Sequence, residues 1–134
     1  MKLTSRRGSR WVAALWAVLR IALGVAALKR PRMACWAWVG PDASRGLTPV
    51  VLGRAAGGRD VALGAGAVAC ALTGAPLTSW VLAGGGADAV DAVATWLVGP
   101  ELPRGRRALV TAVSATSALT AVFLATQVDR RVRR

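Results

Sequence analysis

The sequence has no histidine and no tyrosine, and only one phenylalanine and two cysteines among its 134 residues. Histidine is the commonest metal ligand and titrates near neutral pH, so its absence removes the usual parts of metal centres and of acid–base catalysis. Cys35 and Cys70 lack the spacing of a metal or redox motif, and we expect them to be small buried residues. We therefore expect no catalytic residue, no metal and no cofactor, and a protein that is not an enzyme.

Acidic residues are also scarce, because six Asp and Glu stand against 18 Lys and Arg and leave a net charge of +12. A strongly basic chain suggests nucleic-acid binding as one function. The net positive charge, however, falls in segments that bracket the hydrophobic blocks, namely residues 1–10, 29–45, 101–107 and 129–134. Such flanks are typical of anchors at lipid headgroups. We expect the lipid bilayer as the partner, and no nucleic acid.

Long apolar blocks separate these basic segments, and 54% of the residues are hydrophobic, with a mean hydropathy of +0.46. Residues 11–28 are interrupted only by Arg20, and residues 108–126 carry no charge. Both reach the length of roughly 18 residues that predicts a membrane span. A signal peptide is the alternative for the first block, but that block ends in a basic run at 29–32 rather than in a small-residue cleavage site. We expect an uncleaved span.

Residues 29–49 read as a connection, since proline and glycine punctuate them. The apolar stretch 33–39 inside this connection is too short to cross a bilayer. Its two tryptophans, Trp36 and Trp38, suit the membrane interface, where an amphipathic ring sits at the level of the headgroups.

Residues 50–100 allow two interpretations. In the first, 61–84 is one uncharged span; in the second, a turn at 73–76 joins two helices into a hairpin. Hydropathy favours the first, but the second brings opposite charges to the same level of the two helices, and we favour it. The predicted fold is then all-α, a single membrane domain over 1–134 in which a bundle of four transmembrane helices covers about 11–28, 50–73, 76–98 and 107–126.

Six charged residues lie inside the predicted spans, apart from Arg107 at the first position of the last span. Ionisable groups at membrane depth are rare and are functional candidates by default. Arg59 falls level with Asp91 across the hairpin, and Arg20 and Asp88 lie near the middle of their spans. The cluster is a candidate polar pathway, or else a set of ion pairs that fixes the register of the helices. Its six charges sum to zero, and its members are Arg20, Arg54, Arg59, Asp60, Asp88 and Asp91.

Glycines follow helical spacing in both arms of the hairpin. Gly53, Gly57 and Gly64 share one face of the first arm with Asp60, and Gly84 continues the small polar face of the second arm. Small residues at this spacing let two helices approach closely in lipid. We expect these two faces to pack on each other.

Two runs carry a resemblance to a known family. The GRD segment at 58–60 and the DAVDA segment at 88–92 resemble a family of uncharacterised actinobacterial four-helix membrane proteins. The resemblance covers roughly residues 11–126 and implies the hairpin, but it supplies no activity. The run from Leu19 to Gly24 is similar to the first helix of DoxX-type membrane proteins, which implies a redox- or quinone-associated role.

The predicted function is a non-enzymatic structural or accessory component of the plasma (inner) membrane, alone, as a homo-oligomer or in a larger complex. The alternatives are a small transporter or channel with a pathway past Arg59, Asp88 and Asp91, and a DoxX-like redox partner. Four spans place both termini on one side. Eight Lys and Arg lie in the two terminal segments against seven in the connections at the other end, which favours cytoplasmic termini.

Overall fold

The computed structural model describes residues 6–129, and within that range every regular element is helical, which confirms the all-α prediction. Of the predicted basic tails at 1–10 and 129–134, residues 1–5 and 130–134 lie outside the described residues, and residues 6–10 belong to the first helix instead of a tail. The elements are α1 (Arg6–Lys29), α2 (Pro31–Val39), α3 (Thr48–Thr73), α4 (Thr78–Leu97), the short 3-10 helix η1 (Gly99–Glu101) and α5 (Arg104–Val128).

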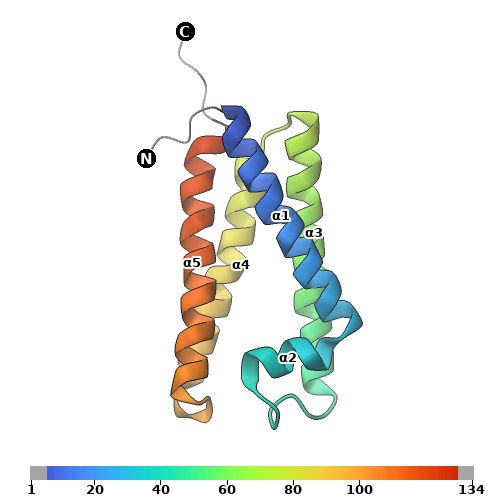
Figure 1. Ribbon diagram of the computed structural model, residues 1–134, viewed down its shortest axis with the longest axis vertical. Helices are drawn as coiled ribbons and strands as arrows, with labels where there is room; N and C mark the ends of the chain where they lie inside the picture. Colours follow the sequence, from blue (N-terminus) through green and yellow to red (C-terminus); the bar gives the residue numbers. More distant parts are fainter. Residues whose placement is uncertain (1–5, 130–134) are drawn as a thin grey trace.

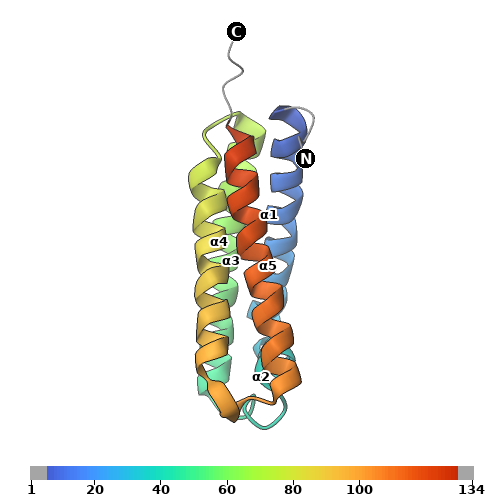
Figure 2. The ribbon, with the colours of Figure 1, turned by 90° about the vertical axis from the view of Figure 1, so that its left-hand side faces the viewer.

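The four long helices lie along the length of the molecule, and each runs antiparallel to the long helix before it in the sequence (Figures 1 and 2). The start of α1, the α3–α4 turn and the end of α5 lie at one end of this bundle. The short helix α2 and the α4–α5 connection lie at the opposite end, and α2 crosses beneath the bundle. Twenty residues of α-helix extend about 30 Å. Even α4, with 20 residues, is therefore long enough for the hydrocarbon core of a bilayer.

The α3–α4 hairpin depends on one glycine. Gly74 has φ +77°, a left-handed conformation that glycine adopts without steric cost and that commonly terminates helices. Pro76 follows and cannot continue the helix of α3, because its nitrogen carries no hydrogen. The alternative of one continuous helix over 61–84 is therefore wrong.

The bundle consists of two closely packed helix pairs, α1 with α3 and α4 with α5, with less contact between the pairs. Glycines form the α1–α3 contact. A Cβ atom placed on Gly57 would lie 2.6 Å from the carbonyl oxygen of Gly24, and one on Gly64 would lie 2.6 Å from Cγ1 of Ile21. The expectation that Gly57 and Gly64 face α4 is wrong, because they serve the approach of α1 instead; on α3 it is Gly66 that faces α4, against the ring of Trp80. Gly53, further along the same face, packs on Pro31 and Cys35 of α2.

The glycines of α4 also face other helices than α3. A Cβ on Gly84 would lie 2.6 Å from Trp16 of α1, and one on Gly85 would lie 2.5 Å from Cβ of Ala121 on α5. Gly84 thus makes room for the tryptophan ring. The second arm of the hairpin uses its small residues to hold α1 and α5, and the two arms approach each other less closely than predicted.

Helix α2 is tied to the bundle by polar contacts. The thiol of Cys35 donates to the carbonyl oxygen of Pro49 at 3.0 Å, and Trp38 donates through Nε1 to Oγ1 of Thr95 at 2.9 Å. Arg106 of α5 donates to the last carbonyl oxygens of α2. The predicted connection at 29–49 therefore contains a docked helix that covers one end of the bundle.

Two helical segments, Arg7–Lys29 and Arg104–Val128, are long and apolar enough to cross a membrane. Within residues 6–129 no other helix passes that test of length and composition. The charged residues of α3 and α4 and their many glycines lower the hydropathy of these two helices. Composition alone therefore does not decide whether α3 and α4 cross a membrane. The placement of their charged side chains is the further evidence.

The α1–α3 contact predicts a difference between adjacent glycines. Gly57→Ala drives a Cβ against the backbone of α1, and we expect it to destabilise the fold by about 1–3 kcal/mol. Gly58→Ala meets nothing within 4 Å and gains helix propensity, so it is the matched control. Unfolding in detergent, followed by circular dichroism, measures both. Equal stability of the two variants would contradict this packing.

Candidate functional site

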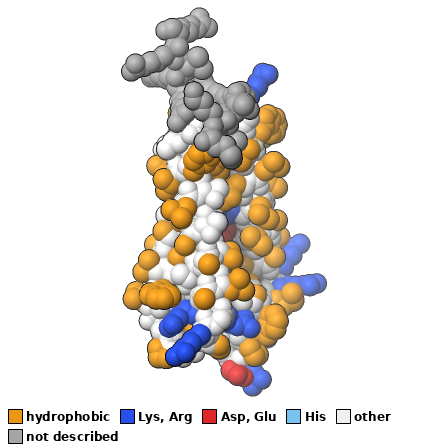
Figure 3. Space-filling view, turned by 60° about the vertical axis from the view of Figure 1, so that its left-hand side comes forward, with side chains coloured by type: hydrophobic (Ala, Val, Ile, Leu, Met, Phe, Trp, Pro, Cys, Tyr) orange, Lys and Arg blue, Asp and Glu red, His pale blue; other side chains and the backbone are white. Residues whose placement is uncertain are grey.

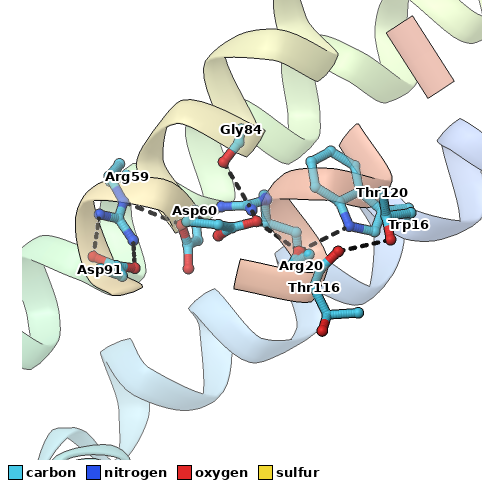
Figure 4. Close-up of polar contacts among 10 residues, drawn as sticks. Trp16, Arg20, Arg59, Asp60, Gly84, Asp91, Thr116 and Thr120 are labelled. Atoms are coloured by element: carbon cyan, nitrogen blue, oxygen red, sulfur yellow. Dashed lines mark hydrogen bonds and ion pairs between the residues drawn. The ribbon is translucent and has the colours of Figure 1, made fainter. Parts of the chain in front are cut away.

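A network of charged side chains crosses the bundle near the middle of its long helices (Figure 4). Its centre is Arg20, halfway along α1. Arg20 donates through Nη1 to Oδ1 of Asp60 on α3 at 2.8 Å, and through Nη2 to Oδ2 of Asp88 and to the carbonyl oxygen of Gly84 on α4, the latter at 3.1 Å. One guanidinium therefore joins the α1–α3 pair to α4.

The fourth long helix enters the network through Ser117. Its hydroxyl donates to Oδ2 of Asp88 at 2.6 Å and accepts a hydrogen bond from Nε1 of Trp16 at 3.3 Å. The Trp16 ring also lies against the guanidinium of Arg20, with 4.8 Å from Cζ to the ring centroid, a cation–π distance. Asp88 is thus held by a cation from α1 and a hydroxyl from α5.

A second ion pair lies about one turn toward the α2 end. Arg59 donates to both carboxylate oxygens of Asp91, at 3.1 and 2.8 Å, the fork geometry that guanidinium and carboxylate favour. Arg59 also donates through Nε to Oδ1 of Asp60 at 3.2 Å, which links this pair to Arg20. The pairing of Arg59 with Asp91 is the one that their equal level in the hairpin predicts.

Arg54 lies outside the network. Its side chain is exposed, and it forms no ion pair with an acidic residue in the described range. The six predicted charges sum to zero, but the inclusion of Arg54 in their cluster is wrong, because the structure brings only the other five together. Two arginines, Arg20 and Arg59, face three aspartates, so the fully ionised network carries one excess negative charge.

The network is most deeply buried at its centre. The side chain of Arg20 is 7% exposed and that of Asp88 13%, whereas Arg59 at the α2 side is 32% exposed. Burial strengthens the attraction within each pair and also raises the cost of leaving a partner alone. Arg20 Nε has no hydrogen-bond partner within the described part of the chain, and the ring of Trp16 covers that guanidinium instead.

A second polar cluster, which we call the terminal clamp, consists of Arg10 and Asp129. Arg10 donates to Oδ1 of Asp129 at 2.8 Å and to the carbonyl oxygens of Cys70 and Ala75. Asp129 Oδ2 accepts hydrogen bonds from the backbone nitrogens of Leu77 and Thr78 and from the Thr78 hydroxyl. The carboxylate therefore caps the start of α4 from the end of α5.

The terminal clamp affects the ionisation of Asp129. Burial of the carboxyl raises its pKa, but the hydrogen bonds from Thr78 and Leu77 and the charge of Arg10 outweigh that effect and hold the pKa below its usual range. The clamp was absent from the sequence-based candidates, because it joins residues at opposite ends of the chain. The only available signal was an acidic residue in an otherwise basic terminus.

The two cysteines lie outside the charged network. Both cysteines are half-buried free thiols rather than fully buried residues. Among residues 6–129 no group of three or more His, Cys, Asp or Glu side chains is placed to hold a metal ion. The chemistry of the site is therefore that of a hydrogen-bonded ion network that joins four helices.

Comparisons with protein-family models, with curated proteins and with solved structures find no match for this chain. The resemblances to the actinobacterial four-helix family and to DoxX-type proteins therefore stay predictions. Any function assigned to the network must be argued from its geometry.

The terminal clamp predicts a pH-dependent stability. Because the pKa of Asp129 is lowered by folding, its contribution is present above the unfolded pKa of about 4 and is lost as the pH falls through the folded value. We expect Asp129→Asn to lower the melting temperature at pH 7, and the gap to the unmodified protein to close at acidic pH. Melting curves from pH 3 to 7 measure this gap. A gap that stays constant across that range would contradict the clamp.

Proposed function

We propose that this chain is a four-helix integral membrane protein with a structural or accessory role, in which the Arg20 network fixes the arrangement of the helices. The observation that carries the proposal is how apolar and charged side chains are distributed between the interior and the outer surface of the bundle. Large apolar side chains point outward on every long helix: Leu15 is 68% exposed, Leu72 70%, Val90 64% and Leu119 71%. The buried interior holds a guanidinium.

Apolar side chains also fill the core of the bundle, around Leu77, Val81 and Leu124. Exposed apolar surface of this extent is nevertheless costly in water. Figure 3 illustrates one face, where hydrophobic side chains cover much of the length and most of the visible basic side chains gather toward the α2 end. In lipid the same outward face is well solvated, and charged groups are expected between helices.

The network also supports the inclusion of α3 and α4 among the spans. A charged side chain at the bilayer centre costs about 2.5–3.5 kcal/mol on insertion scales. Asp60, Asp88 and Asp91 each face a guanidinium, which offsets part of that cost. Small residues at the α1–α3 and α4–α5 contacts give the close approach by which helices associate in lipid.

A structural role predicts that charge balance controls the amount of folded protein. Arg20→Gln leaves three partly buried aspartates against Arg59 alone, and we expect a destabilisation of about 3–5 kcal/mol. Adding Asp88→Asn restores the original excess of one negative charge, so the double variant should recover much of the loss. The measurement is the level of protein in the membrane fraction together with the melting temperature in detergent.

Arg54→Gln is the matched control for this experiment, since it removes the same charge from an exposed position on α3. It should leave the level and the melting temperature close to those of the unmodified protein. If Arg54→Gln and Arg20→Gln behaved alike, or if the double variant were worse than Arg20→Gln, the structural proposal would be wrong.

The excess carboxylate favours a second candidate function, a small transporter for a proton or a monovalent cation. Asp88→Asn leaves two arginines against two aspartates, so a loss of flux in this variant would not follow simply from unfolding. The measurement is the decay of an imposed pH gradient in liposomes that contain the protein and an enclosed pH-sensitive dye. Equal decay in protein-free liposomes would exclude proton transport.

A further inference from the structure

A basic hollow lies at the corner where α1 ends and α2 begins, beside the start of α3. Its volume is about 400 Å³. Four basic side chains line it: Lys29 and Arg30 at the end of α1, Arg32 on α2 and Arg54 on α3. All four are exposed, so the hollow is open at the surface of the molecule.

The four cations have no counter-charge within the described chain. No acidic residue lines the hollow. In the described range Asp42 pairs with Arg45 at 3.7 Å, and Asp60 pairs with Arg20 and Arg59. Four like charges around one hollow repel one another unless an anion lies between them. The missing partner is therefore an anion, and phosphate suits arginine, whose fork of donors matches its oxygens.

The same corner also offers apolar surface. Met33 is 59% exposed and Leu47 75% exposed, and both line the hollow beside the cations. An inorganic ion has no use for such surface, whereas an amphiphile has an apolar chain that covers it. The corner lies at the α2 end of the long helices, where the headgroups of one leaflet meet a bundle that crosses the bilayer (Figure 1).

We propose that this basic corner binds an anionic phospholipid, with the headgroup phosphate among Lys29, Arg30, Arg32 and Arg54 and the first part of an acyl chain over Met33 and Leu47. Basic pockets beside transmembrane helices are known to hold acidic headgroups. The inference depends on the proposed membrane location. It goes further in naming the class of lipid and the leaflet, which is the one that contacts the α2 end.

The hollow at the opposite end of the bundle is a weaker candidate for a phosphate site. It has about the same volume, 390 Å³, and is lined by Arg7 and Arg10. Arg10 already donates to Asp129 and to two carbonyl oxygens. Among residues 6–129, the lining of that hollow therefore offers less unengaged positive charge to a phosphate than the lining of the corner beside α2.

The test compares two double variants that lose the same charge from the same end of the bundle. Arg32→Gln with Arg54→Gln removes two cations from the hollow. Arg45→Gln with Arg104→Gln removes two exposed cations outside it. All four positions are exposed, so neither variant disturbs a buried contact. Purified protein in detergent is titrated with phosphatidylglycerol or with phosphatidylcholine of the same acyl chains, and bound lipid is counted by native mass spectrometry.

We expect the unmodified protein to bind phosphatidylglycerol at least about fivefold more tightly than phosphatidylcholine, because one basic residue near an acidic headgroup contributes about that factor. The hollow variant should lose at least about fivefold in affinity for phosphatidylglycerol, and the control variant less than about twofold. No preference between the lipids, or an equal loss in both variants, would overturn the proposal.

Incorporation of the same preparation into phosphatidylcholine nanodiscs separates the two proposals. Protein that enters neutral nanodiscs but shows no preference for phosphatidylglycerol overturns the lipid site and leaves the membrane proposal standing. Protein that does not enter nanodiscs, and stays soluble without detergent, overturns both.

Discussion

The hydrogen bonds of Arg20 join the two helix pairs of the bundle. The α1–α3 and α4–α5 pairs pack tightly within themselves and more loosely against each other. The guanidinium of Arg20 reaches across that looser contact to Asp60, Asp88 and the carbonyl oxygen of Gly84, and Asp88 brings in Ser117 of α5. A buried cation with directional donors fixes how the neighbouring helices are rotated about their axes and how far they are shifted along them. Apolar packing alone specifies both weakly.

The contacts of Arg20 depend on glycines in the neighbouring helices. The Arg20 side chain and the Trp16 ring fit against α4 because Gly84 has no Cβ, and α1 lies close enough to α3 for Arg20 to reach Asp60 because Gly24 and Gly57 face each other. Small residues therefore decide where the charges meet. The outward faces are free to carry large apolar side chains, which is the composition that a lipid environment favours.

The sequence predicted well at which height along the bundle each charged residue lies. It predicted less well which helices pack against each other. Helical rise and the turn at 73–76 place Arg59 level with Asp91, and counting from the ends of the spans places Arg20 level with Asp88. Which helix lies beside which is set by packing in three dimensions, so the glycine face of α3 was assigned to α4 instead of α1. Arg54 is assigned to the charge cluster because it falls within the predicted span 50–73, although its side chain lies on an exposed face of α3. The terminal clamp joins Arg10 to Asp129, a pairing that no local pattern encodes.

The central claim is that four helices cross the membrane with the Arg20 network at mid-depth. The most direct measurement is labelling of single cysteines in whole cells and in inverted vesicles with a membrane-impermeant thiol reagent. Cysteines replace Ala43, Pro76 and Pro103 in turn, in a background that lacks Cys35 and Cys70. The account predicts that positions 43 and 103 are labelled from one side and position 76 from the other. Labelling of all three from the same side would contradict it, because α3 and α4 would then not cross the membrane.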